Sequence, residues 1–492
     1  MINASLSIPY TYAKKHGVFV KEKTPDSFVV YHTSFTPMDA LLEIQRLYYQ
    51  QGLEFNLLED EVFQQKLTDF YQQQSQFQTQ TNWLEEELEL NSLAKEIPKH
   101  QDLLDSQNDA PIIQLINALF MQAVRQKASD IHIETYENRI TVRFRIDGIL
   151  TEILNLDPHV APLVITRIKV MAHLDIAEKR LPQDGRISLR VAKHQIDVRV
   201  STLPANHGER VVMRILDKQA QQLNMSLLGM PQELLNKMTH MIGQPHGILL
   251  VTGPTGSGKT TSLYAMLSQM DAKTHNILTI EDPIEFDLPG ISQTQTNSKI
   301  DMTFAKGLRA ILRQDPDVVM IGEIRDLETA EIAIQASLTG HLVLSTLHTN
   351  TALGAVSRLQ DMGVEPFLLS TSLLGVLAQR LVRRLCQHCK QKKQIHIKDL
   401  PWLEHPTQET YDIYEPKGCE QCHHTGYQGR TGIFELIICD DILKAMIHRQ
   451  DNPQSMELHI RQTCPSIRHD GWLQVLKGNT SISEILRVTS DF

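Results

Sequence analysis

A short apolar strand runs directly into a glycine-rich loop, and this junction constrains the fold more than any other feature. The strand 248–251 reads ILLV, and the loop consists of Gly253, Pro254, Thr255, Gly256, Ser257, Gly258, Lys259, Thr260 and Thr261. Glycines let consecutive backbone N–H groups curl around phosphates, and a helix beginning near Lys259 directs its positive end at them. We therefore predict an ATP-binding P-loop. Lys259 should reach the β- and γ-phosphates, and the Thr260 hydroxyl should bind Mg²⁺.

Two later apolar strands end in carboxylates, which hydrolysis needs to position water and metal. Strand 277–280 is followed by Glu281 and, after Pro283, by Glu285; strand 318–321 is followed by Gly322 and Glu323. Such sheets place catalytic groups at strand ends. Because Gly322 stands where a Walker B aspartate usually sits, we expect Glu323 to contact Mg²⁺ through water and Glu281 to be the general base. The alternative for Glu281 and Glu285 is a helix cap or a surface ion pair.

Two histidines bracket the next apolar strand, 342–347. His341 precedes this strand and His348 follows it. We expect both to lie near the catalytic edge of the sheet, where they could sense the γ-phosphate or relay a proton. The alternative is an ordinary hydrogen-bonded core histidine.

Length and charge limit the class of protein. The chain has 492 residues, an apolar fraction of 41% and a formal net charge of −10, which predicts two to four globular domains. The acidic balance argues against a protein that coats nucleic acid, although it does not argue against a local basic channel. No signal-peptide pattern and no apolar run of roughly 18 to 20 residues is seen. We expect a cytoplasmic chain that reaches a membrane only through a partner or a surface.

Composition divides the chain into segments. Residues 1–82 predict a small domain, with a helix capped by Thr36 that has Pro37 at its first position. Residues 83–108, at the end of a Gln-rich and acidic run, predict a linker. Residues 109–216 show strand alternation, with Val142 and Phe144 on one face and Arg199 and Arg214 opposite the apolar residues of later strands.

The second half has the pattern of a different fold class. After a linker at 217–228, residues 229–492 alternate apolar strands with helical segments, which indicates an α/β domain with a parallel sheet.

Two CxxC pairs interrupt that second half at 386–422. Four thiolates at this spacing are typical of closed tetrahedral zinc coordination, so we expect a structural Zn²⁺ that orders an insertion without an adequate core of its own. The predicted ligands are Cys386, Cys389, Cys419 and Cys422. A redox pair is the alternative, and the substitute ligands would be His388, His423 and His424. Cys439 and Cys464 lack partners at motif spacing and are expected to be buried thiols.

The ordered motifs resemble those of the secretion ATPase superfamily. They are GPTGSGKTT, TIEDPIEF, ILRQDPDVVMIGEIRD and TGHLVLSTLHT, preceded by ASDIHIE and VRFRIDG. The resemblance covers residues 109–492 and, more faintly, the IPYTYAKKHGV start. It implies a RecA-like ATPase domain after a PAS-like domain, a homohexameric ring, and closure of one domain on the other.

The resemblance also implies roles for four arginines. Those expected to meet the phosphates are Arg199, Arg214, Arg313 and Arg325. A planar, permanently charged guanidinium suits phosphate and stabilises charge during transfer. Without the resemblance, each would be taken for a solvated surface residue.

Within this family, a four-cysteine insertion is typical of assembly motors for type II secretion and type IV pili. The compact N-terminal region resembles that of the type II secretion motors, which implies ATP hydrolysis that drives pseudopilus assembly at the inner membrane. The implied partners are the cytoplasmic domain of an inner-membrane secretion protein, bound by the N-terminal domain, and the inner-membrane platform protein. A type IV pilus assembly ATPase is the alternative.

The sequence conflicts with two further classes of protein. A motor that moves nucleic acid conflicts with the net charge and with the lack of a basic, aromatic-rich stretch. A scaffold that binds nucleotide without hydrolysis conflicts with the intact Lys259, Glu281 and Glu323. The sequence thus predicts an ATPase that uses ATP, Mg²⁺ and Zn²⁺ and binds no nucleic acid.

Overall fold

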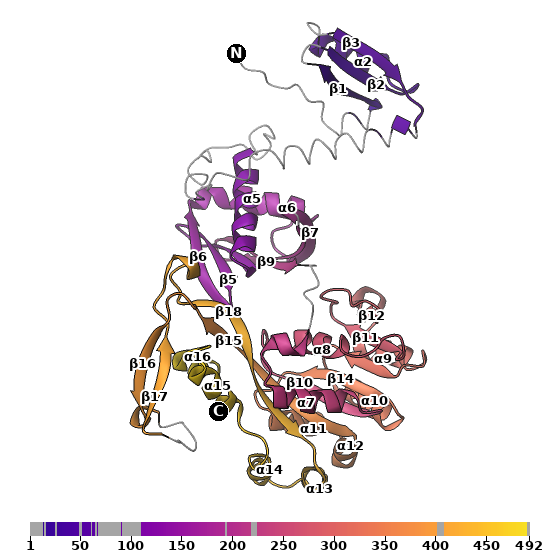
Figure 1. The fold of residues 1–492 in the computed structure, drawn as a ribbon. Coiled ribbons are helices and arrows are strands. Elements are labelled where there is room, and N and C mark those ends of the chain that lie inside the picture. Colours follow the sequence, from indigo (N-terminus) through magenta and orange to yellow (C-terminus); the bar gives the residue numbers. More distant parts are fainter. Residues whose placement is uncertain are drawn as a thin grey trace. The chain divides into compact units, whose positions relative to one another are not determined.

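The computed structural model divides into two compact units, Met1–Glu89 and Leu90–Phe492 (Figure 1). It describes residues 16–24, 27–48, 52–60, 110–191, 194–217, 224–400 and 408–489, with isolated positions 13, 62, 63, 66 and 90. The start at 8–12, the Gln-rich run and the linker predicted at 83–108 lie almost wholly outside these residues, as do residues 218–223 of the linker predicted at 217–228. The described end of that linker is not open chain but a 3-10 helix, Met225–Leu228. Among the described residues, no helix has the length and hydropathy needed to cross a membrane.

The first unit contains a three-stranded sheet and helix α2 (Met38–Leu47). Its strands are β1 (Val18–Thr24), β2 (Ser27–His32) and β3 (Gly52–Leu57). β2 lies in the middle, antiparallel to β1 and parallel to β3. Phe19, Val30 and Ile44 are buried between helix and sheet.

The predicted cap of helix α2 is wrong by one residue. Pro37 is the N-cap, and no side chain caps the helix. The Thr36 hydroxyl instead donates a hydrogen bond of 2.7 Å to the Gly17 carbonyl oxygen. A tertiary contact to the turn before β1 thus occupies the group that sequence reasoning assigned to the helix.

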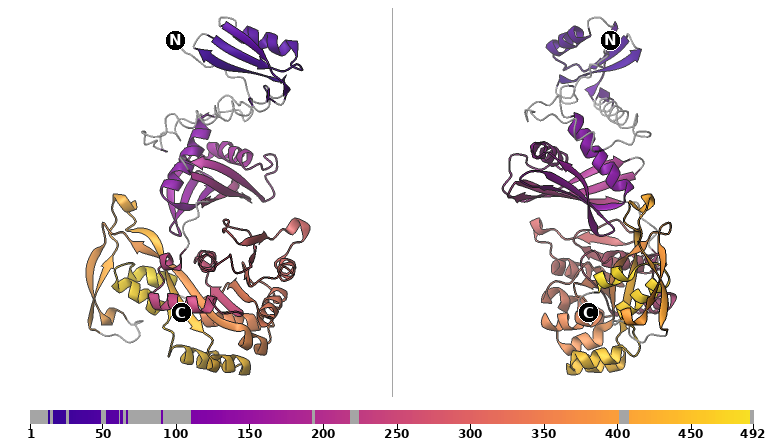
Figure 2. Two further views of the ribbon diagram at one scale, coloured as in Figure 1. Left: turned by 45° about the vertical axis from the view of Figure 1, so that its right-hand side comes forward. Right: turned by 90° about the vertical axis from the view of Figure 1, so that its left-hand side faces the viewer.

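The second unit begins with an antiparallel sheet in the order β6-β5-β4-β9-β8-β7. Its strands are β4 (Ala128–Thr135), β5 (Ile140–Ile146), β6 (Ile149–Leu156), β7 (Gln183–Val191), β8 (His194–Ala205) and β9 (Gly208–Asp217). Helices α5 (Ala110–Arg125) and α6 (Ala161–Met171) pack against one face, as Figure 2 shows. Val142 and Phe144 are fully buried in that core, as their alternation predicts. The opposite face therefore carries the polar residues of each strand.

A seven-stranded sheet follows, in the order β12-β11-β13-β14-β10-β15-β18. Its strands are β10 (Gly247–Thr252), β11 (Ile277–Glu281), β12 (Ser292–Gln295), β13 (Val318–Ile321), β14 (Leu342–Leu347), β15 (Leu373–Leu385) and β18 (Tyr427–Ile438). All neighbours pair in parallel except β15 and β18, which form a long antiparallel pair. Parallel strands end at one edge, so the segments that follow β10, β11, β13 and β14 meet there.

Helices cover both faces of this sheet, which explains why β10, β11, β13 and β14 are buried along their whole length. On one face, Leu249 and Val251 pack against α7 (Gln232–Ile242) and α8 (Lys259–Leu267). On the other face, Ile248 and Leu250 belong to a larger core. Its helices are α9 (Phe304–Ile311), α10 (Leu327–Leu338), α11 (Ala352–Asp361), α12 (Pro366–Ser372), α13 (Asp441–Arg449) and α14 (Pro453–Ile460). This is the α/β domain with a parallel sheet that the pattern predicts, and it agrees with the RecA-like domain that the resemblance implies.

The insertion between β15 and β18 contains a two-stranded antiparallel sheet, β16 (Gln391–His396) and β17 (Thr410–Glu415). Tyr411 and Ile413 are buried against Trp472 of α15 (Ile467–Leu476), next to α16 (Ile482–Val488). The rings of Tyr411 and Trp472 lie 5.1 Å apart in a T-shaped contact. The expectation that the insertion lacks an adequate core is therefore wrong, because the C-terminal helices supply one.

Candidate nucleotide and metal sites

The loop between β10 and α8 has the backbone of a phosphate cradle. Gly256 and Gly258 have φ values of 79° and 86°, a region that side chains disfavour. A Cβ at Gly253 would lie 2.5 Å from the Gln379 carbonyl oxygen, so β15 leaves room for glycine only. The predicted P-loop residues therefore lie together between strand end and helix start.

Lys259 lies inside this loop and is 8% exposed. Its Nζ donates hydrogen bonds to the carbonyl oxygens of Gly253 and Pro254, at 2.8 and 3.2 Å. Burial lowers the pKa of Lys259 to about 8; the charge of Glu323 opposes this shift and that of Arg380 adds to it. A cation in such dry surroundings favours an anionic ligand.

Two hydroxyl groups complete the fit to a phosphate and its metal. The Ser257 hydroxyl is buried and has no hydrogen-bond partner among the described residues. Thr260 lies exposed in the first turn of α8. Phosphate oxygens would satisfy the first group, and Mg²⁺ would suit the second.

Glu323 lies where β13 reaches the same edge of the sheet. Its carboxylate forms an ion pair with Arg325 and lies 3.2 Å from Nε2 of His348. Arg325 also lies 3.8 Å from Asp282, which follows β11. The structure thus brings three of the predicted site residues, Glu323, Arg325 and His348, into direct contact.

Glu281 lies at the end of β11 but is buried, with 2% of its surface exposed. Its oxygens accept hydrogen bonds from the Tyr264 hydroxyl, from Thr279 Oγ1 at 2.6 Å and from Gln293 Nε2 at 3.0 Å. Burial and the Glu281 carboxylate raise the pKa of Tyr264 strongly. Both oxygens of Glu281 are therefore engaged, and a catalytic role would require it to leave this network.

Glu285, four residues later, is more accessible. Its carboxylate lies 3.6 Å from a guanidinium nitrogen of Arg199, and the two side chains are 34% and 23% exposed. The same nitrogen donates to the Ile284 carbonyl oxygen at 3.2 Å. Burial lowers the pKa of Arg199, while Glu285 opposes that shift.

Arg214 lies beside Arg199 on the neighbouring strand. It forms a 3.0 Å ion pair with Asp130. A cavity of about 620 Å³ is lined by Arg199, Arg214, Asp282 and Pro283, among others. Two predicted phosphate-binding arginines thus face the loop that follows β11.

The structure separates His341 and Arg313 from this edge. His341 precedes β14 and His348 follows it, so six residues of strand, about 20 Å, lie between them. The expectation that both histidines lie near one edge is wrong, because the two ends of a strand lie at opposite edges of the sheet. His341 Nδ1 lies 2.8 Å from the Ala336 carbonyl oxygen. Arg313 is exposed before β13 begins and donates to the Arg309 carbonyl oxygen at 2.8 Å.

Three residues near the site carried no sequence signal. Tyr264 lies in α8, and Gln379 and Arg380 lie in β15, outside every motif. Gln379 Oε1 accepts a 2.6 Å hydrogen bond from Ser262 Oγ of α8. Arg380 is buried and donates to the Asn350 carbonyl oxygen at 2.7 Å. Only strand pairing brings β15 beside β10, so sequence spacing could not identify them.

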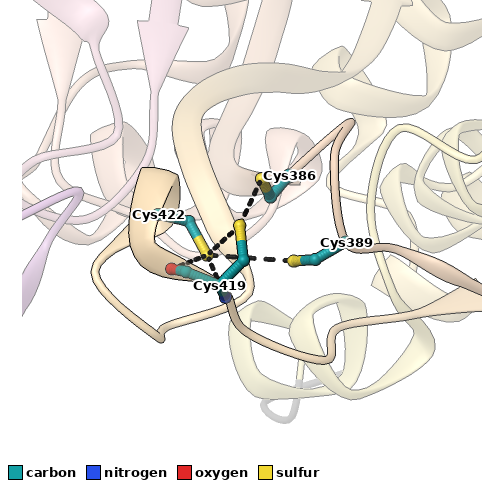
Figure 3. Close-up of side chains that lie close together, drawn as sticks. All are labelled: Cys386, Cys389, Cys419 and Cys422. Carbon is teal, nitrogen blue, oxygen red and sulfur yellow. Dashed lines mark hydrogen bonds between the residues drawn. The ribbon is translucent and has the colours of Figure 1, made fainter.

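The four predicted cysteines form one cluster, and Figure 3 shows their sulfurs directed toward one another. Three Sγ–Sγ distances are 3.7, 3.8 and 3.9 Å. Sulfurs bound tetrahedrally to zinc at about 2.3 Å lie about 3.8 Å apart, so the donors fit this metal. The group contains no histidine among the described residues, which argues against His388, His423 and His424 as ligands.

Backbone groups support a thiolate at Cys422. Burial raises its pKa, but N–H groups of Cys419 and Gly426, each 3.2 Å from its Sγ, help to bring the pKa down to about 6. Such donors stabilise negative sulfur, the form that binds metal. Cys439 and Cys464 are buried elsewhere, as expected, and burial raises the pKa of each to about 12.

The fold and the P-loop define a RecA-like nucleotide-binding protein with a second, four-cysteine centre. Comparison with known families shows to which family of nucleotide-binding proteins the chain belongs. Residues 105–487 match the family described as "Type II/IV secretion system protein", and residues 7–71 match the family of an N-terminal domain of "GSPII protein E". The chain belongs to this secretion family, and the resemblance drawn from its motifs is confirmed.

Curated relatives match almost the whole chain. The "Type II secretion system ATPase E" of Vibrio cholerae serotype O1 is 54% identical over 490 residues, covering 98% of this chain and 97% of that protein. The "Type II secretion system protein E" of Klebsiella pneumoniae is 54% identical over 485 residues, covering 98% and 96%. The solved structure of the Legionella pneumophila ATPase DotB is 20% identical, with a TM-score of 0.57, and covers 77% of this chain and 96% of its own. That likeness supports the fold alone.

Proposed function

We propose that this chain hydrolyses ATP to ADP and phosphate and thereby powers type II protein secretion by driving pseudopilus assembly at the inner membrane. The observation that carries the ATPase proposal is the P-loop, with buried Lys259 inside it and Glu323 near enough to influence its pKa. Support for the secretion role comes from full-length relatives named for type II secretion.

In the proposed mechanism, P-loop N–H groups and Lys259 bind the β- and γ-phosphates. Thr260 would hold Mg²⁺ directly and Glu323 would hold it through water, and the bound ion would supply positive charge at the phosphates. Arg325 and His348 orient the Glu323 carboxylate through their direct contacts. Arg199 and Arg214 stabilise charge that develops on the terminal phosphate when their sheet meets the site.

The general base is assigned to Glu281, with Glu285 as the competing residue. Glu281 ends β11 at the nucleotide edge, but Tyr264, Thr279 and Gln293 occupy its oxygens. Glu285 is more exposed and pairs with Arg199. Comparing Glu281→Gln with Glu285→Gln decides between them, because the true base variant should bind ATP and lose turnover.

We further propose that the four cysteines bind one structural Zn²⁺. Four protein ligands would close its coordination shell and leave no position for a substrate. His341 and Arg313 are not assigned to the chain's own nucleotide site, because they lie away from its edge. A phosphate contact by Arg313 would require a second copy of the chain, as a homohexamer would provide.

The N-terminal unit is proposed to bind the cytoplasmic domain of an inner-membrane secretion protein, which would hold the chain at the membrane together with the platform protein. The supporting observation is the match of residues 7–71 to a domain of GSPII protein E. Deleting residues 1–101 should abolish recruitment to vesicles that carry the partner and leave basal hydrolysis intact. Loss of hydrolysis with retained recruitment would reverse the assignment.

The functional test measures phosphate release with and without the partner's cytoplasmic domain, anionic lipid or single-stranded DNA. Stimulation by partner and lipid supports the secretion motor. Stimulation by DNA alone would favour a nucleic-acid motor, and absence of hydrolysis in every arm would favour a non-hydrolysing scaffold. Complementation of a secretion-deficient and a pilus-deficient strain then separates type II secretion from type IV pilus assembly.

A further inference from the structure

A single row of charged residues crosses the antiparallel sheet of the second unit. Arg186 on β7 pairs in register with Arg199 on β8, and Arg199 pairs with Arg214 on β9. Asp130 on β4 lies opposite Arg214, and Arg145 on β5 lies opposite Asp130. Residues directly opposite one another share a face, so four arginines and one aspartate form a continuous line.

The arginines in this row differ in whether a carboxylate lies close enough to neutralise their charge. Asp130 lies 3.0 Å from Arg214 and 3.5 Å from Arg145, so one carboxylate serves two guanidinium groups. Arg199 has Glu285 at 3.6 Å. Arg186 has no ion pair or hydrogen bond from its side chain within the part of the chain that the structure describes. Like charges opposite one another are unfavourable, so the β7 end of the row favours an anion.

The start of β7 is held in place by close contacts. A Cβ at Gly185 would lie 2.4 Å from the Ala172 carbonyl oxygen, so this position admits only glycine. Gln183 accepts a 2.8 Å hydrogen bond from the Asp175 N–H and donates to the Asp175 carbonyl oxygen at 3.0 Å. The backbone that carries Arg186 is therefore fixed at the cavity rather than free in solution.

Arg186 also lines the same 620 Å³ cavity as Arg199, Arg214, Asp282 and Pro283. Three guanidinium groups thus face the loop that follows β11. The three guanidinium groups outnumber the two carboxylates that line the cavity, Asp184 and Asp282, and suit oxygens that carry several negative charges.

We propose that Arg186 is a third arginine of the phosphate-binding face and contacts oxygens of the terminal phosphate of ATP. The inference rests on the proposed ATPase function and adds a residue to that site. Arg186 supplies charge that Arg199 and Arg214 cannot, because those two already have carboxylate partners. Since ADP lacks the terminal phosphate, Arg186 favours triphosphate over diphosphate.

The test compares Arg186→Ala, Arg186→Lys and the unchanged full-length chain. Arg186→Ala should lower kcat/KM for ATP and the affinity for a non-hydrolysable triphosphate by about tenfold or more, with ADP affinity within about twofold. Arg186→Lys should restore only part of each loss, because an ammonium group lacks the planar fork. Arg139→Ala is the matched control. It removes the same charge from the same sheet, at a hairpin where Arg139 lies over the Tyr136 ring, and should change neither quantity.

The outcomes separate this inference from the proposed function. Absence of hydrolysis by the unchanged chain would sink the ATPase proposal and this inference with it. Hydrolysis by the unchanged chain with equal activity of Arg186→Ala would overturn the inference alone. Equal loss of ATP and ADP affinity would also overturn it. Dissociation of oligomers with unchanged triphosphate affinity, followed by light scattering, would assign Arg186 to a contact between copies instead.

Discussion

The nucleotide edge and the cysteine cluster are both small sites, yet different forces hold them. The P-loop joins a strand and a helix that are buried in an extensive apolar core, and its conformation follows from glycine φ angles and close contacts with β15. Within the described part of the insertion, the local core of the cysteine cluster consists of its own four residues. The first site is built before its ligand binds, whereas the second would gain its cohesion from the proposed metal.

This difference predicts that each site can be damaged without loss of the other. Damage to the nucleotide site should remove chemistry and leave the fold intact. Damage to the cysteine cluster should loosen the segment near Cys419 and leave chemistry intact. The β16–β17 sheet should survive either change, because Tyr411 and Ile413 pack against Trp472 rather than against the cysteines.

The largest expected effect is at Lys259. Lys259→Ala removes the buried cation of the phosphate cradle, so turnover should fall by at least about 100-fold and triphosphate affinity should also fall. Phosphate-release kinetics and nucleotide titration measure the two losses. Lys237→Ala, which removes an exposed lysine paired with Glu233, is the control and should retain activity. Near-normal turnover of Lys259→Ala would contradict the assigned site.

A similar loss of turnover is expected when the general base is replaced, and ATP binding should be retained. Glu281→Gln should bind ATP normally and lose hydrolysis by about 100-fold, and Glu285→Gln should lose less. Tyr264→Phe removes one hydrogen bond to Glu281, so it should alter the pH dependence of kcat without loss of ATP affinity. Single-turnover assays across pH measure these effects. The base role passes to Glu285 if its variant alone stops turnover.

An intermediate effect is expected at the cysteine cluster. Cys389→Ser removes one of four ligands, so zinc content should fall from about one per chain and hydrogen exchange should rise around residues 416–426. ATP affinity should change less than about twofold, because the P-loop has its own core. Cys439→Ser serves as the control, since Cys439 lies outside the cluster. Full zinc retention by Cys389→Ser would refute the four-cysteine assignment.

The most gradual effect concerns pH. Because burial lowers the pKa of Lys259 to about 8, the lysine of the free protein loses its proton as pH rises through 8. Bound triphosphate favours the charged form, so binding above pH 8 should take up a proton, and affinity should fall by up to about tenfold per pH unit. Calorimetry in buffers of different ionisation enthalpy measures this uptake. Affinity that is flat from pH 7 to 9.5 would show that Lys259 stays charged throughout.

Local chemistry allowed several features to be predicted from the sequence. The P-loop needs glycines at positions of positive φ, and a lysine and threonine at set distances, all within nine residues. Alternation placed Val142 and Phe144 in the core because a strand has a period of two. The four cysteines were identifiable because zinc ligands have a narrow chemistry and spacing.

Other features could be seen only in the tertiary structure, because they depend on which strands and helices become neighbours. Tyr264 on α8 and Gln293 on β12 bury Glu281, and nothing in the motif that contains Glu281 indicates either contact. The direction of β14 sends His341 and His348 to opposite edges. Helix α15, some 60 residues away, supplies the core of β17. The register of β7, β8 and β9 aligns Arg186 with Arg199 and Arg214, because cross-strand neighbours are set by pairing and by burial of the opposite face rather than by distance along the chain.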